Sequence, residues 1–358
     1  MIYNPIIPCR SKEAIISSSQ VLPTNPSLND IAGEYTTRCF QQCKLCYGNF
    51  DPHGKEMPFE QIKEIKRQFD LANITTSHLT GGEILWHQQI EQIIRLFSQS
   101  GYRIEIDTNG VLISKEMAKL LAKFGVEVLV GIESLDPELY HWYRGTDSVG
   151  EVLKGLDAML QQNITPGIQI IAANFKGFPG ERYDPVENIF QLLEYSTAKG
   201  IPAYLLQYRP IGRASSFTDA ISDLTEEQKT QLKCLIHSLP FDQKKLVSGD
   251  IAFASPNKAD YYGCIGGILL ANMDINGNIF ICNWMRDRKF GNIFQEDLQR
   301  IITRMREFRF KGLEELNCRL RNCEFNEENI CFGPCLISNA YREMTISDNR
   351  QLGLTPQT

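Results

Sequence analysis

Short apolar, β-branched segments alternate with amphipathic helical segments between about residues 31 and 212, and this alternation limits the possible folds more than any other feature of the chain. In VLISKEMAKLLAKFG, one helical face carries the apolar residues Met117, Leu120, Leu121 and Phe124, and the following VEVLVGIE is apolar and β-branched. Further strands are expected at about 76–80, 103–107, 168–172 and 203–208, and further helices at about 58–71, 88–99, 149–162 and 186–198.

This repetition of about six strand–helix units predicts an α/β fold, in which a parallel sheet curls into a partial (βα)6, TIM-like barrel. Ligands of such folds collect at the carboxyl ends of the strands. Polar or cysteine-containing segments follow the first four expected strands, namely the loop at 39–46, then 81–83, 107–110 and 133–136. The sequence therefore predicts a ligand site at that end of the barrel.

The pattern changes after residue 214. An amphipathic helix is expected at about 225–238, and six cysteines follow between residues 264 and 335. Asn276-Gly277 lies between strand-like flanks and predicts a β-hairpin. We expect a small C-terminal domain that is held together by metal and not by apolar packing. The predicted division is an N-terminal extension at 1–30, the barrel at 31–214, a helical bridge at 215–260, the cysteine-rich domain at 261–340 and a tail at 341–358.

Composition limits the partners. The formal charge is -6, and the isoelectric point near 5.6 leaves no basic face for a phosphate backbone, so nucleic acid is disfavoured. The chain has no apolar run of about 18 residues, and its N-terminus does not resemble a signal peptide. Its 11 cysteines cluster instead of pairing as in a secreted scaffold. We expect a cytoplasmic protein without a membrane partner.

Cys39, Cys43 and Cys46 are spaced as Cys-x-x-x-Cys-x-x-Cys, and no further cysteine follows until Cys234. A four-iron cluster normally takes four protein thiolates, so a group of three indicates that one iron is left for a small molecule. The alternatives are a zinc site or free core thiols. Zinc usually takes four ligands in spaced pairs, and the nearest histidine is His53, which disfavours zinc.

The segment TTRCFQQCKLCYG resembles the cluster loop of the radical S-adenosylmethionine (SAM) superfamily. The resemblance implies a 4Fe-4S cluster on Cys39, Cys43 and Cys46 that cleaves bound SAM to a 5′-deoxyadenosyl radical. A barrel mouth would cage such a radical. The other residues that the resemblance implies at the cofactor are Tyr47, Gly81, Gly82, Glu83, Thr108, Asn109, Ser134, Arg144, Asn174 and Gln207.

Three of these assignments carry a physical reason or an alternative. Gly81 and Gly82 lack side chains, so backbone oxygens can approach the amino group of SAM. Arg144, with Ser134, is assigned to the SAM carboxylate because a guanidinium can hold a carboxylate through two hydrogen bonds. The alternative for Arg144 is a charge on the surface of a helix. Asn174 and Gln207 are assigned to the adenosyl group, or are satisfied polar residues at strand ends.

The C-terminal cysteines resemble the SPASM domain, an auxiliary-cluster module of radical SAM enzymes that mature peptides. Cys264 and Cys282 fit Cys-x12-Gly-x4-Cys, although the later spacings are stretched. The resemblance implies one or two auxiliary 4Fe-4S clusters, with Cys264, Cys282 and Cys335 at one and Cys318, Cys323 and Cys331 at the other. Each set then lacks a fourth thiolate, which Asp348, Cys9 or a substrate would replace. Zinc is the alternative for the last four cysteines.

Cys234 stands apart in the expected helix at 225–238. One interpretation is a small buried hydrophobic residue. The other is a catalytic thiol that donates a hydrogen atom to a substrate radical, which would make the protein an epimerase.

The resemblance implies hydrogen abstraction from a ribosomally made precursor peptide, giving a crosslink, an epimerised residue or a backbone excision. The expected partners are the peptide and an external one-electron reductant of the flavodoxin or ferredoxin type. A separate small leader-peptide-binding protein is also expected, because the 38 residues before Cys39 are too few for the leader-binding module that such enzymes often carry ahead of the barrel. The alternatives are a small-molecule dehydrogenase, a sulfatase-type protein maturase, and a non-enzymatic iron–sulfur electron carrier. The carrier would need neither an open iron nor Gly81-Gly82-Glu83.

Overall fold

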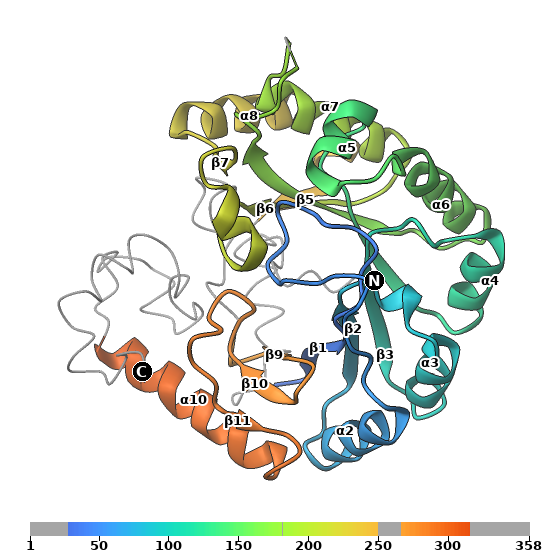
Figure 1. Ribbon diagram of the computed structural model, residues 1–358, viewed down its shortest axis with the longest axis vertical. Coiled ribbons are helices and arrows are strands. Elements are labelled where there is room, and N and C mark those ends of the chain that lie inside the picture. Colours follow the sequence, from blue (N-terminus) through green and yellow to red (C-terminus); the bar gives the residue numbers. More distant parts are fainter. Residues whose placement is uncertain (1–27, 181, 250–265, 316–358) are drawn as a thin grey trace.

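The computed structural model describes residues 28–180, 182–249 and 266–315, with side chains as far as residue 309. Six parallel strands lie side by side in chain order (Figure 1). They are β1 (Asp30–Thr36), β2 (Thr76–Gly81), β3 (Arg103–Thr108), β4 (Glu127–Gly131), β5 (Gly167–Asn174) and β6 (Ala203–Gln207). A short strand, β8 (Val247–Gly249), continues the sheet beyond β6, and β7 (Ser222–Asp223) pairs with β5.

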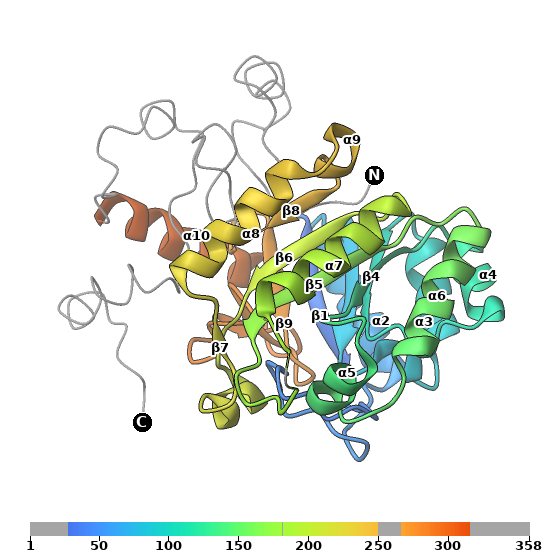
Figure 2. The ribbon, with the colours of Figure 1, turned by 90° about the horizontal axis from the view of Figure 1, so that it is seen from above.

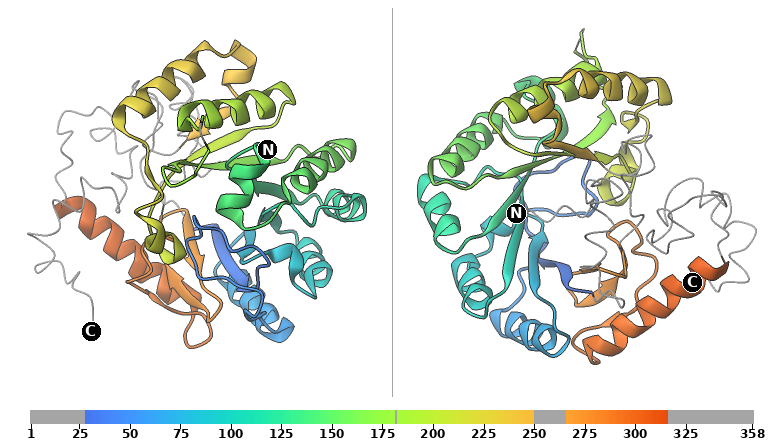
Figure 3. Two further views of the ribbon diagram at one scale, coloured as in Figure 1. Left: turned by 45° about the horizontal axis from the view of Figure 1, so that its top comes forward. Right: turned by 180° about the vertical axis from the view of Figure 1, so that it is seen from behind.

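Helices cover the outer side of this curled sheet (Figure 1, and Figure 3 from behind). The expected helices are confirmed as α2 (Phe59–Leu71), α3 (Ile90–Ser98), α4 (Lys115–Lys123), α6 (Val149–Gln161), α7 (Pro185–Ala198) and α8 (Glu226–Ser238). The remaining short helices are η1 (Ile84–Trp86), α5 (Pro137–Arg144), η2 (Gly212–Phe217) and α9 (Phe241–Lys244). The expectation of an α/β, partial (βα)6 barrel is therefore confirmed.

The two faces of the strands differ in polarity, because successive side chains point to opposite sides of a sheet. Tyr35 of β1 faces outward, where its ring centroid lies 6.4 Å from that of Phe97 in α3. The opposite side of the sheet, here called the inner face, carries Asp30, Glu34, His78, Glu105, Asp107 and Glu127. Apolar burial against the helices thus holds the barrel together, and its interior remains polar.

The hairpin predicted at Asn276-Gly277 is confirmed. Strands β9 (Leu270–Met273) and β10 (Asn278–Phe280) pair antiparallel, and Gly277 has a φ of 81° at the turn. Strand β9 also pairs in parallel with β1, so the hairpin extends the barrel sheet at its first edge (Figure 2). A further strand, β11 (Gly291–Asn292), and α10 (Leu298–Glu315) follow. The predicted domain boundaries stay predictions.

The sheet is open. In the described part of the chain, β11 stands at one end of the strand order and β8 at the other, and the two do not pair. The prediction of a partial barrel agrees with this order. No helix in the residues described above has the length and apolar character needed to cross a lipid bilayer.

Leu121 and Leu71 offer a matched test of the packing between helices and sheet. Both leucines lie in the last turns of helices, but Leu121 is 0% exposed and Leu71 is 63% exposed. We expect Leu121→Ala to lower the free energy of unfolding in urea by about 3 kcal/mol, because it leaves a cavity in the core. Leu71→Ala should change it by less than about 0.5 kcal/mol. Equal effects would contradict the assignment of the helix faces.

Candidate active site

The cysteine loop that follows β1 is anchored to three other segments by backbone hydrogen bonds. Cys39 N donates to Asp51 O at 2.9 Å, and Lys44 N donates to Tyr143 O, at the end of α5, at 2.8 Å. On the other side, Ala214 N in η2 donates to Cys46 O at 3.1 Å. The three thiols therefore hang on a loop whose position is set by the barrel.

Burial raises the pKa of each thiol in this loop. The pKa of Cys39 rises to about 12, first because the side chain is buried and then because Cys43 would repel a second negative charge. Burial raises the pKa values of Cys43 and Cys46 as well. Thiols of this kind remain protonated at neutral pH unless a metal takes the place of the proton. The donor set of three clustered thiols fits an iron–sulfur cluster.

Gly81 and Gly82 allow the end of β2 to pack directly against this loop. A Cβ atom at Gly81, whose φ is 136°, would lie 2.1 Å from Thr36 O, and one at Gly82 would lie 2.2 Å from Arg38 O. Gly82 N donates to Thr36 O at 2.8 Å. Glycine at these two positions thus lets the end of β2 contact the backbone of the cysteine loop. From the sequence, the expected reason is a different one, namely the approach of a ligand to the backbone.

Glu83 organises the neighbouring strand ends. Its side chain is fully buried, and its carboxylate accepts hydrogen bonds from Leu85 N at 2.9 Å, Thr108 Oγ1 at 2.7 Å and Asn109 N at 2.8 Å. A carboxylate has about four acceptor positions, so about one stays available on Oε2. In the structure Glu83 mainly holds the end of β3 in place.

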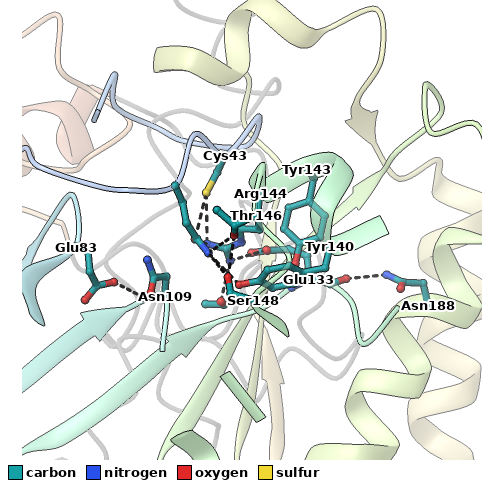
Figure 4. Close-up of polar contacts among 12 residues, drawn as sticks. Cys43, Glu83, Asn109, Glu133, Tyr140, Tyr143, Arg144, Thr146, Ser148 and Asn188 are labelled. Carbon is teal, nitrogen blue, oxygen red and sulfur yellow. Dashed lines mark hydrogen bonds and ion pairs between the residues drawn. The ribbon is translucent and has the colours of Figure 1, made fainter. Parts of the chain in front are cut away.

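Arg144 joins α5 to the cysteine loop and to the end of β4 (Figure 4). Its Nη2 donates to Glu133 Oε2 at 2.6 Å and to Gly131 O at 2.7 Å, and its Nη1 lies 3.6 Å from Cys43 Sγ. The residue is only 9% exposed. The alternative of a charge on a helix surface is therefore wrong.

Several buried donors at this end of the barrel have no acceptor among the described residues. Among them are Nδ2 of Asn109 and Nε of Arg144. Buried polar groups are nearly always hydrogen-bonded in folded proteins. Both donors flank the cysteine loop, so the site fits a ligand that carries acceptor atoms, such as the carboxylate and ribose of SAM.

Two other predicted cofactor residues already have side-chain partners in the protein. Ser134 Oγ donates to Asn188 Oδ1 at 2.7 Å, and Gln207 Nε2 donates to Asp223 Oδ2 at 2.6 Å. The backbone of Asn174 pairs with Ser222 in the short ladder between β5 and β7. Their contact with a cofactor stays a prediction.

Sequence reasoning missed the connection between the hairpin and the barrel mouth. Arg286, in the loop after β10, forms an ion pair with Glu34 on the inner face of β1. The same guanidinium lies 5.0 Å from the ring centroid of Tyr47, the residue next to Cys46. The paired residues are 252 positions apart in the chain, so local patterns gave no signal of the contact.

Cys234 requires a correction. It is exposed on α8, which packs against α7 outside the sheet (Figure 1), so the expectation of a buried hydrophobic residue is wrong. Its position on this outer layer also gives no support to a thiol that donates hydrogen inside the barrel. Cys282 follows β10 and is half-buried. The other predicted metal ligands, Cys264, Cys318, Cys323, Cys331 and Cys335, lie outside the described residues.

The barrel segment is similar in sequence to known proteins. Residues 34–193 match the sequence profile of the Radical SAM superfamily. A GTP 3′,8-cyclase of Marinobacter nauticus is 24% identical over 292 residues, which cover 77% of this chain and 83% of that protein.

Two solved structures resemble this fold. Streptococcus suis SuiB bound to precursor peptide SuiA superposes with a TM-score of 0.65 and 16% identity, covering 90% of this chain and 75% of that chain. Native anSMEcpe with bound AdoMet and Cp18Cys peptide gives a TM-score of 0.63 and 17% identity, covering 92% and 99%. These two likenesses show that the fold is shared. The match to the Radical SAM superfamily covers residues 34–193, the segment that carries the three thiols.

Proposed function

We propose that this protein is a radical SAM enzyme that abstracts a hydrogen atom from a ribosomally made peptide to install a modification. The observation that carries the proposal is the barrel mouth, where the thiols of Cys39, Cys43 and Cys46 lie beside the unpartnered donors of Asn109 and Arg144. A non-enzymatic electron carrier would have no use for these donors. This arrangement therefore favours an enzyme that binds a small polar cofactor next to its cluster.

The residues of the barrel mouth would have different roles. Cys39, Cys43 and Cys46 would hold a 4Fe-4S cluster, which together with SAM supplies one-electron cleavage of a carbon–sulfur bond. Arg144 Nε would donate to the SAM carboxylate, while its two Nη atoms keep Glu133 and Cys43 in place. Asn109 Nδ2 would donate to the ribose. The Glu83 carboxylate accepts a hydrogen bond from Asn109 N, so the role of Glu83 is to position Asn109 for its contact with the cofactor.

A peptide substrate is supported by the two structural neighbours, which were crystallised with peptides and superpose over nine-tenths or more of this chain. The inner face adds a physical reason. Carboxylates of Asp30, Glu34, Glu105 and Asp107 line it, and such a surface repels polyanions but accepts neutral or cationic groups. The proposal does not specify which bond is made or broken. The exposed position of Cys234 no longer supports epimerisation.

A nucleotide cyclase is the second candidate, because the Marinobacter relative is named for its action on GTP. A triphosphate would meet the carboxylates of the inner face, which disfavours it. A small-molecule dehydrogenase and a sulfatase-type maturase would use the same mouth. Anaerobic incubation with GTP distinguishes the cyclase, since the peptide proposal expects no GTP-dependent formation of 5′-deoxyadenosine.

The remaining parts of the proposal concern groups outside the barrel mouth. One or two auxiliary 4Fe-4S clusters would bind to Cys264, Cys282, Cys318, Cys323, Cys331 and Cys335. A flavodoxin- or ferredoxin-type reductant would supply electrons, and a separate small protein would bind the leader peptide. We expect the enzyme alone, with SAM and dithionite, to cleave SAM slowly and to accelerate when its peptide and this partner are added.

Replacing the cysteines one at a time tests the cluster assignment. We expect Cys43→Ser to contain about four fewer irons per chain than the wild type and to form no 5′-deoxyadenosine. Cys234→Ser is the matched control, because Cys234 is an exposed cysteine on an outer helix. It should keep the iron content and the activity of the wild type. Loss of activity in Cys234→Ser would instead restore the hydrogen-donor interpretation.

Arg144→Lys tests the cofactor contact without removing the charge next to Glu133. Lysine has no counterpart of Nε, so the KM for SAM should rise by about tenfold or more, as expected for a lost hydrogen bond to a charged group. Arg67→Lys serves as the control, because Arg67 also pairs with a glutamate, Glu64, but on an exposed helix surface. An unchanged KM for SAM in Arg144→Lys would refute the assignment.

A further inference from the structure

Three buried side chains meet on the inner face, away from the thiols. Asp30 begins β1, His78 lies in the middle of β2, and Glu105 lies in the middle of β3. The strand register aligns Ala32 with His78, and His78 with Glu105, so adjacent strands present these side chains to the same side. One potential ligand atom from each of Asp30, His78 and Glu105 lies within 4.8 Å of the other two.

The carboxylates of this group are buried, and one of their atoms has no partner. Asp30 is 4% exposed and Glu105 is 2% exposed. Oδ1 of Asp30 is inaccessible to solvent and makes no hydrogen bond within the described part of the chain. A buried carboxylate is unfavourable unless a hydrogen-bond donor or a cation compensates it. This oxygen therefore points to a positively charged ligand at the centre of the group.

The neighbouring side chains increase the excess of carboxylates over cationic groups. Asp107 Oδ2 lies 3.0 Å from His78 Nε2. Arg103 is shared between two carboxylates, with Nη1 at 2.8 Å from Glu105 Oε1 and Nε at 2.6 Å from Glu127 Oε1. In this network of described residues, four carboxylates face one guanidinium and one imidazole.

We propose that Asp30, His78 and Glu105 bind a divalent cation of the Mn²⁺, Fe²⁺ or Zn²⁺ type, with Asp107 as a further oxygen donor. One imidazole nitrogen and several carboxylate oxygens form a donor set that these ions accept. The ligands stand on three hydrogen-bonded strands, which hold them in place before the ion arrives. The site is separate from the thiols, and its role is to hold β1, β2 and β3 together on the inner face.

Protons and organic cations are the competing ligands. Burial lowers the pKa of His78, but the carboxylates of Asp107, Asp30 and Glu105 together outweigh burial and raise it to about 10. Burial raises the pKa of Asp30 to about 6 and of Glu105 to about 7. The phenol of Tyr204, from β6, also faces this network, and burial raises its pKa to about 12. An organic cation would leave the proton on His78 in place, whereas a metal ion bound to the imidazole nitrogen takes the place of that proton.

Mn²⁺ is the appropriate probe, because imidazole and carboxylate groups bind it and thiolates prefer softer ions. The experiment uses the full-length, cluster-loaded protein under anaerobic conditions and follows free Mn²⁺ by electron paramagnetic resonance. We expect the wild type to bind about one Mn²⁺ per chain, and His78→Gln or Glu105→Gln to weaken binding by about tenfold or more. His237→Gln, at an exposed histidine of α8, should bind as the wild type does.

The pH dependence of binding provides a test on the wild type alone, in case a variant fails to fold. Mn²⁺ binding should weaken as the pH decreases from 8 to 7, because protons compete with the ion for the imidazole and carboxylate ligands. Absence of saturable binding, or unchanged affinity in both variants, would overturn the proposal. None of these measurements requires turnover, so they are independent of the proposed activity.

Discussion

The geometry of the barrel mouth depends on the close approach of two backbone segments, the end of β2 and the start of the cysteine loop. Gly82 N donates to Thr36 O, and Glu83 N donates to Arg38 O, each at 2.8 Å. Any side chain at Gly81 or Gly82 would overlap the loop backbone. The same contact places the Glu83 carboxylate under Asn109. These two backbone hydrogen bonds therefore fix the position of the thiols relative to Asn109, which follows β3.

A second constraint comes from buried charge. Glu34 and Arg286 are far apart in the chain and form an ion pair inside the barrel, next to Tyr47 of the cysteine loop. Arg286 is half-buried, but the side chain of Glu34 is only 3% exposed, so separating the pair is costly because it would leave the buried carboxylate uncompensated. The pair therefore favours one docking of the hairpin on β1 over other dockings. It also brings the segment after Cys282 towards the loop of Cys46.

Local patterns accounted for most of the fold, because strand–helix alternation and the Asn276-Gly277 turn depend on neighbouring residues. The pairing of β9 with β1 could not be predicted in this way, since it joins Leu270 to Asp30. The cysteine loop was visible as a motif, whereas the partners of Arg144 were not. The error at Cys234 has a simple reason. Leu232 faces the core of the molecule, and a residue two positions later lies about 200° away on the helix.

The polar interior has opposite character at its two levels, and this difference constrains what can occupy it. At the mouth the unpartnered buried atoms include donors on Asn109 and Arg144, and these require acceptor atoms such as those of a carboxylate or a ribose. Deeper on the inner face, Oδ1 of Asp30 is an acceptor without a partner among the described residues, and the carboxylates around it favour a cation. Apolar packing against the outer helices stabilises the barrel without satisfying either level. Ligands of opposite charge are therefore what the two levels of this barrel need to complete their hydrogen bonding and charge balance.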